Sequence, residues 1–161
     1  MHYQPQRHLL KDRIILVTGA SDGIGREAAL TYARYSASVI LLGRNDDKLR
    51  TVAQEIEREG GIPPRWFTLD LLTCTPQACQ QLAQQISMHY PRLDGVLHNA
   101  GLLGDICPME EQKPEVWQQV MQVNVNGTFM LTQALLPLLL RSESGSLVFT
   151  SSSVGRQGRA N

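Results

Sequence analysis

Residues 14–25, with the sequence IILVTGASDGIG, decide the fold of this 161-residue chain. The apolar run Ile14–Val17 does not alternate with polar residues, which predicts a strand buried on both faces. Glycines follow at positions 19, 23 and 25, and residues 24–35 place apolar side chains on roughly one helical face, namely Ile24, Ala28, Tyr32 and Tyr35. A strand, a glycine turn and a helix in this order direct free backbone N–H groups and the positive end of a helix dipole toward a phosphate. The alternative is a tight turn that binds no ligand.

Strand and helix patterns alternate along the rest of the chain. Further strands are expected at residues 38–42, 65–70, 94–98 and 146–151, and helices at about 46–59, 76–90 and 111–140. Strands separated by helices pair in parallel through right-handed crossovers. We therefore expect an α/β fold, a doubly wound parallel (Rossmann) sheet of five strands in the order 3-2-1-4-5. Its ligand crevice should open at the C-terminal ends of strands one and four.

Length and composition limit the class of protein. A chain of 161 residues suggests one domain, residues 1–161. Its 15 basic and 15 acidic residues cancel, which leaves no electrostatic footprint for nucleic acid or an anionic membrane. There is no signal-peptide pattern and no apolar run long enough to span a bilayer. The three cysteines are odd in number and lack C-x-x-C spacing, so we expect reduced thiols, no metal site and a soluble cytoplasmic protein.

Two motifs resemble those of the short-chain dehydrogenase/reductase family, in its short single-domain branch. Residues 18–25 have the spacing Thr-Gly-x-x-x-Gly-x-Gly, and residues 98–101 (HNAG) are similar to the family's Asn-Asn-Ala-Gly with His98 in place of the first asparagine. The pair of motifs is similar to that of uncharacterised bacterial oxidoreductases. The resemblance implies a nicotinamide dinucleotide bound by Gly19, Ala20, Ser21, Asp22, Gly23, Ile24, Arg44, Asp70, Leu71, Asn99, Ala100, Gly101 and Val123. A lone histidine at a strand end is more often packed or hydrogen-bonded than catalytic, so His98 is not expected to be an acid–base residue.

Arg44 indicates which dinucleotide is bound. The place just after the second strand meets the adenosine ribose, and an acid there would favour NAD. Gly43 has no side chain, and the guanidinium of Arg44 can form paired hydrogen bonds to a 2′-phosphate. We expect NADP(H) rather than NAD, although Arg44 could also be a solvated surface residue. Asp22 argues against NADP, because relatives that prefer NADP often place a base in that loop.

Three further positions have both a purely structural and a functional interpretation. Asp70 is either a turn aspartate or, as the resemblance implies, a hydrogen-bond partner of the adenine amino group. Asn124 lies in VNVNG, a poor sequence for a helix interior, and such conflicts often mark functional sites. The resemblance makes Asn124 the residue that distorts the helix and holds a water of the proton relay. The alternative is that Gly127 only allows close packing of the helix. Ser152 matches the serine that hydrogen-bonds the substrate carbonyl, although Ser151 and Ser153 stay open and a serine run also suits a turn.

The family's Tyr-x-x-x-Lys pair does not occur in these 161 residues: the last tyrosine is Tyr90 and the last lysine is Lys113. In the family, the lysine lowers the tyrosine pKa, and the tyrosine acts as the acid–base group. We therefore expect the amino-terminal part of an NADP(H)-dependent oxidoreductase that acts on a small carbonyl or alcohol, inactive as this piece. The alternative is a non-catalytic dinucleotide-binding or regulatory module. The whole protein is expected to form a homodimer or homotetramer, and this piece to expose an apolar patch on one face of strands four and five that invites association.

Overall fold

A five-stranded parallel sheet forms the centre of the computed structural model, which describes residues 5–155 and 157. The strand order is β3-β2-β1-β4-β5, and all four neighbouring pairs are parallel. The strands are β1 (Ile14–Thr18), β2 (Ser38–Gly43), β3 (Arg65–Thr68), β4 (Gly95–His98) and β5 (Ser146–Phe149). The expected fold and strand order are thus confirmed. Strands β3 and β5 end two residues earlier than predicted, so Asp70 and the serine run lie in the connections beyond them.

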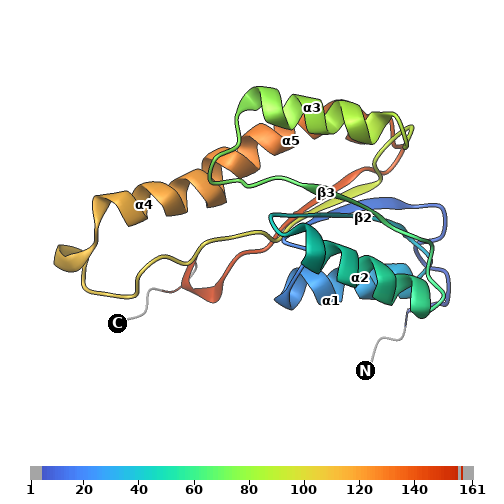
Figure 1. Ribbon diagram of the computed structural model, residues 1–161, viewed down its shortest axis with the longest axis horizontal. Coiled ribbons are helices and arrows are strands. Elements are labelled where there is room, and N and C mark those ends of the chain that lie inside the picture. Colours follow the sequence, from blue (N-terminus) through green and yellow to red (C-terminus); the bar gives the residue numbers. More distant parts are fainter. Residues whose placement is uncertain (1–4, 156, 158–161) are drawn as a thin grey trace.

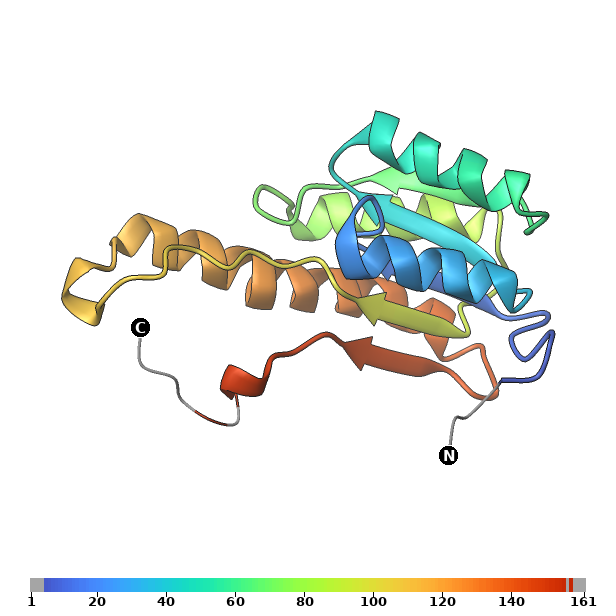
Figure 2. The same cartoon turned by 90° about the horizontal axis from the view of Figure 1, so that it is seen from below.

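Helices cover both faces of the sheet, as Figures 1 and 2 show. The helices α1 (Gly23–Arg34) and α2 (Asp46–Arg58) lie on one face, and α3 (Pro76–Ser87) packs with α5 (Thr128–Leu139) on the other. Each face has its own apolar core. Leu16 of β1 belongs to the core under α3 and α5, and its neighbour Val17 belongs to the core under α1 and α2. This explains the non-alternating apolar pattern of β1.

The helix termini follow local sequence chemistry. The side chain of Asn45 accepts a hydrogen bond from the Lys48 N–H at 2.9 Å and caps α2. Thr75 does the same for the Ala78 N–H at 3.2 Å, and Pro76 occupies the first turn of α3. Helix α2 ends at Arg58, shortly before Gly60, whose φ of +82° suits glycine.

The buried face of α1 differs from the predicted one. The side chain of Ile24 is 69% exposed, and the buried residues of α1 are Gly25, Ala29, Leu30 and Ala33. These residues are mostly small, which lets α1 lie close to the sheet. The prediction was correct for Ala28 and Tyr32, which are partly buried against the core, and wrong for Ile24.

The predicted long helix is interrupted. A short 3-10 turn, η1 (Met109–Glu111), precedes α4 (Pro114–Met121), and a π-helical segment, η2 (Gln122–Gly127), joins α4 to α5. Segment η2 coincides with the sequence conflict at Asn124, Asn126 and Gly127, which confirms the expected distortion of the helix. Helix α4 extends beyond the sheet in Figure 1.

The far edge of the sheet carries exposed apolar side chains. Leu147, Val148 and Phe149 of β5 are 37%, 50% and 54% exposed. They confirm the expected apolar patch at β5, whereas β4 itself is buried. Within the described part of the chain, none of the helices combines the length and the apolar character that a bilayer span requires.

Candidate functional site

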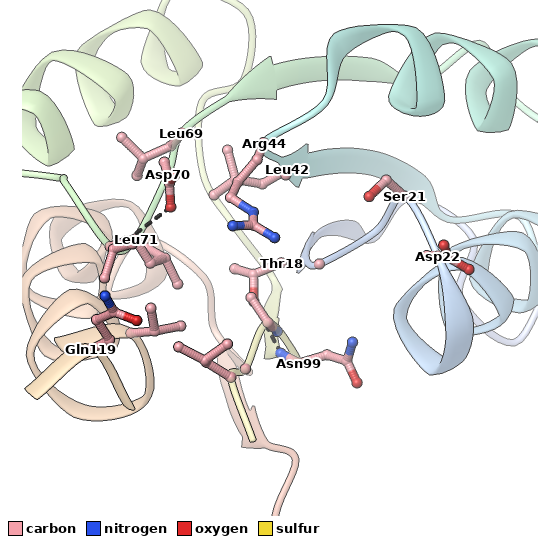
Figure 3. A pocket seen from close by; sticks show the side chains of 17 residues that line it. Thr18, Ser21, Asp22, Leu42, Arg44, Leu69, Asp70, Leu71, Asn99 and Gln119 are labelled. Atoms are coloured by element: carbon pink, nitrogen blue, oxygen red, sulfur yellow. Dashed lines mark hydrogen bonds between the residues drawn. The ribbon is translucent and has the colours of Figure 1, made fainter. Parts of the chain in front are cut away.

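A cleft of about 450 Å³ opens where β1, β2 and β4 end, as the doubly wound topology predicts (Figure 3). It gathers residues that are far apart in the sequence. Ten of the predicted cofactor-binding residues line it: Gly19, Ser21, Asp22, Arg44, Asp70, Leu71, Asn99, Ala100, Gly101 and Val123.

The glycine loop is shaped by close backbone contacts. Gly19 has a φ of +64°, and a Cβ atom there would lie 3.0 Å from the backbone of Ala100. A Cβ atom at Gly25 would overlap the Gly19 carbonyl oxygen and lie 2.6 Å from Asn99 Nδ2. These glycines therefore leave the space in which the loop, the start of α1 and the segment after β4 converge.

Thr18, which the sequence analysis did not select, holds two walls of the cleft together. Its hydroxyl oxygen accepts hydrogen bonds from the N–H groups of Asn99 and Ala100, both at 3.0 Å. Asn99 in turn accepts one from the Thr150 hydroxyl at 3.2 Å, which links β4 to the end of β5. The position of Thr18 could have identified it from the sequence, because it is the last residue of β1, directly before the first glycine of the loop.

Arg44 extends into the cleft between Asp70 and Leu71 on one side and Ser21 and Asp22 on the other (Figure 3). Its side chain is exposed, and it forms no ion pair within residues 5–155 and 157. A guanidinium that is not engaged in an ion pair can bind an anionic group directly. The cleft therefore fits a ligand with a phosphate close to the end of β2.

Asp70 forms a turn beyond β3. Its Oδ1 accepts a hydrogen bond from the Leu72 N–H at 2.9 Å, which is the turn role considered from the sequence. The residue is half-buried and lines the cleft. Leu71 is buried beside it and accepts a hydrogen bond from Gln122 Nε2 at 3.2 Å through its carbonyl oxygen.

Three predicted residues of the glycine loop do not line the cleft. Ala20 is fully buried, and its N–H donates to the Leu42 carbonyl oxygen at 3.1 Å. Gly23 and Ile24 start helix α1, where Asp22 accepts a hydrogen bond from the Gly23 N–H at 2.8 Å. Their part in binding would be through the N–H groups of the first helical turn, which lack intrahelical acceptors.

Asn124 does not line the cleft itself but binds the backbone of Leu102, which does. Its Oδ1 accepts from the Leu102 N–H at 2.8 Å, and its Nδ2 donates to the Leu102 carbonyl oxygen at 2.9 Å. A Cβ atom at Gly127 would lie 2.8 Å from the Leu71 carbonyl oxygen, so the close-packing interpretation also holds for this segment. Ser152 is exposed, beyond the end of β5, and does not line the cleft.

His98 is packed, as expected, and has no catalytic geometry. Its ring stacks on Phe149 with centroids 5.0 Å apart, and the side chain is 4% exposed. Thr132 donates its hydroxyl proton to the Thr128 carbonyl oxygen at 2.7 Å, so the Thr132 oxygen accepts from His98 Nε2–H at 3.0 Å. Burial lowers the pKa of His98 to about 4, which keeps the ring neutral.

Leu102 and Gln119 also line the cleft and were missed by sequence reasoning. Leu102 directly follows the HNAG motif. Gln119 lies four residues before Val123, so helical spacing alone could have placed it on the same side.

Comparison with known proteins adds three findings. A family model described as short chain dehydrogenase matches residues 13–161. The "Uncharacterized oxidoreductase YciK" of Escherichia coli (strain K12) is 78% identical over 161 residues, which are 100% of this chain and 64% of that protein. The chain thus spans about two thirds of that relative's length, and the expected likeness to bacterial oxidoreductases is confirmed.

Two similar crystal structures contain a dinucleotide. A protein from Escherichia coli CFT073, described as a short chain dehydrogenase and complexed with NADPH, matches with a TM-score of 0.96 and 78% identity, covering 98% of this chain and 65% of that one. A protein from Shigella flexneri 2a str. 301, complexed with NADP, matches with a TM-score of 0.95 and 77% identity, covering 97% and 65%.

Proposed function

The chain belongs to the short chain dehydrogenase family, and from this membership we propose that it is part of an NADP(H)-dependent oxidoreductase acting on a small carbonyl or alcohol. The observation that carries the proposal is the guanidinium of Arg44, which lines the cleft at the ends of β1 and β4 and forms no ion pair with any residue that the structure describes. The complexes of similar proteins with NADPH and NADP support the choice of cofactor. Residues 1–161 are proposed to form one dinucleotide-binding domain, and a cytoplasmic location stays a proposal based on sequence.

The predicted cofactor-binding residues have separate proposed tasks. The first-turn N–H groups of α1 and residues 19–24 bind the pyrophosphate, and Arg44 binds the 2′-phosphate. Asp70 contacts the adenine, beside the buried Leu71. Asn99 to Gly101 and Val123 form the ribose and nicotinamide side.

Bound NADP(H) supplies or accepts a hydride at the nicotinamide ring. Ser152 is proposed to donate a hydrogen bond to the substrate carbonyl oxygen, with Ser151 and Ser153 as neighbours. Asn124 is proposed to hold a water of the proton relay, and its bonds to Leu102 support a positioning task as well.

Replacement of Arg44 tests the cofactor assignment. Arg44→Asp should weaken NADPH binding about tenfold to hundredfold, which corresponds to roughly 1.5–3 kcal/mol, because the variant puts a carboxylate opposite the 2′-phosphate. Binding is measured by calorimetric titration with NADPH and with NADH. Arg7→Asp is the matched control, since Arg7 is exposed and does not line the cleft. Equal affinity of the Arg44 variant and the unchanged chain for both nucleotides would contradict the assignment.

The 161 residues contain no Tyr-x-x-x-Lys, so we expect them to bind NADPH weakly and to turn over no carbonyl substrate. The measurement is NADPH oxidation at 340 nm with a panel of aldehydes and ketones, on a preparation whose mass agrees with 17.9 kDa. Turnover that follows the protein through purification would refute this expectation.

A second candidate, carried over from the sequence analysis, is a dinucleotide-binding or regulatory module without catalysis. Both candidates predict binding by these residues. They differ in a longer preparation that contains Tyr-x-x-x-Lys, where only the oxidoreductase turns over a carbonyl substrate.

A further inference from the structure

An acidic residue stands where the proposed cofactor would bring negative charge. Asp22 lines the cleft and is exposed at the start of α1. A carboxylate at a helix N-terminus occupies the place at which a phosphate is otherwise favoured. Asp22 lines the same cleft as Arg44, the residue proposed to bind the 2′-phosphate, so its charge bears on that subsite as well.

Lys48 of helix α2 contacts this carboxylate. Its Nζ lies 2.9 Å from Asp22 Oδ2, across 26 residues of sequence. The backbone of Lys48 is fixed at the start of α2, since its N–H donates to the cap residue Asn45. The hydrogen bond from Lys48, with smaller contributions from the Gly23 N–H and the Lys48 charge, lowers the pKa of Asp22 below its ordinary value.

Competing charges are already engaged elsewhere. Asp46 and Asp47, the acids nearest in sequence to Lys48, pair with Arg50. Arg26, the other base close to Asp22, pairs with Glu55. Within the described residues, Asp22 therefore has Lys48 as its ion-pair partner, and Lys48 does not itself line the cleft.

We propose that Lys48 masks the charge of Asp22 and thereby lets the cleft accept the 2′-phosphate of NADP(H). Lys48 is a positioning residue that determines nucleotide specificity through Asp22. This role rests on the proposed function. Exposed ion pairs contribute little to folding stability, so the pair matters for the charge of the cleft rather than for the fold.

The test compares Lys48→Gln, Asp22→Asn and the double variant, with Lys11→Gln as the control for loss of one exposed lysine outside the cleft. Asparagine keeps the capping acceptor of Asp22 without its charge. Affinities for NADPH and NADH are measured at low and at high ionic strength, and melting temperatures confirm that each variant is folded.

Lys48→Gln should weaken NADPH binding about three- to tenfold and NADH binding less than about twofold, because the unmasked carboxylate repels the 2′-phosphate most. The loss should shrink at high salt. The double variant should bind NADPH about as well as the unchanged chain, since it has no carboxylate left to mask.

Three results would overturn the inference. Lys48→Gln could have the same nucleotide affinities as Lys11→Gln, or it could lose affinity for NADPH and NADH equally. The double variant could also bind NADPH as weakly as Lys48→Gln does. The last result would mean that Lys48 contacts the nucleotide directly. An unchanged chain that binds neither nucleotide would instead overturn the proposed function, on which the masking depends.

Discussion

His98 shows at the scale of one residue how packing decides chemistry. In another environment the imidazole would titrate near neutral pH. Here the stacking on Phe149 and the hydrogen bond to Thr132 bury the ring, and its Nδ1 has no hydrogen-bond partner among the described residues. The side chain joins β4 to α5 and β5 instead of exchanging protons.

The depressed pKa of His98 predicts a pH dependence of stability. Above about pH 6.5 both the folded and the unfolded chain carry neutral His98, so its contribution is fully present. As the pH falls toward about 4, His98 becomes protonated in the unfolded chain but stays neutral in the folded chain. The free energy of unfolding therefore decreases. The decrease attributable to His98 is up to about 3 kcal/mol.

Urea unfolding between about pH 7 and pH 5 measures this slope. In His98→Asn the slope should become shallower, whereas His89→Asn, at an exposed histidine, should leave it unchanged. An identical slope in all three proteins would contradict the assignment.

At the scale of elements, the π-helical segment η2 links the helix to the cleft. Its Asn124 binds both backbone polar atoms of Leu102, and its Gln122 binds the carbonyl oxygen of Leu71. Leu71 and Leu102 both line the cleft. The distortion therefore positions two walls of the site from one turn of helix.

Removal of the Asn124 amide should loosen the segment after Gly101. Asn124→Ala is expected to increase hydrogen–deuterium exchange at the Leu102 amide at least about tenfold, because that N–H loses its acceptor. Asn126→Ala is the matched control, since Asn126 contacts Gln122 within the same segment at 3.3 Å. Equal exchange in the two variants would show that Asn124 does not hold Leu102.

At the scale of the whole molecule, the two ends of the sheet differ. At the end opposite the cleft, the buried Asp94 accepts hydrogen bonds from the Ile14 N–H at 3.0 Å, Arg92 Nε at 2.9 Å and the Ser142 hydroxyl at 2.6 Å. These bonds tie together the starts of β1, β4 and β5. The other end stays open and carries the cleft.

Exposed apolar side chains recur along the interrupted helix at intervals of four residues. Trp117, Met121, Val125 and Phe129 are 58%, 36%, 49% and 63% exposed. Together with β5, they support the proposal that the whole protein is a homodimer or homotetramer.

We expect the 161-residue chain to associate through this strip as its concentration rises. Phe129→Glu should shift the sedimentation coefficient toward the monomer, because a charge would be buried at the contact. Met88→Glu, at a 75% exposed residue directly after α3, should leave association unchanged. A chain that stays monomeric at every concentration would refute the prediction.

The sequence by itself determined the parallel sheet, its strand order and the place of the cleft. Apolar runs, glycines and caps such as Asn45 and Thr75 determine secondary structure through interactions among a few consecutive residues, so their effect can be predicted from the sequence. The unfavourable helix residues around Asn124 also marked the segment in which the helix is interrupted, although the distortion itself was expected from the family resemblance. Ten of the thirteen predicted cofactor-binding residues line the cleft, and nine of these ten follow strands that end at one edge of the sheet, whereas Val123 comes from η2.

Only the tertiary structure decided which side of α1 is buried, that Ala20 points into the core, and that Thr18, Leu102 and Gln119 join the cleft. It also decided the stacking of His98 on Phe149 and the pairing of Lys48 with Asp22. Each of these features depends on contacts between residues that are distant in sequence. The free energies of such contacts are set by how whole helices and strands pack against one another, and no local sequence pattern encodes them.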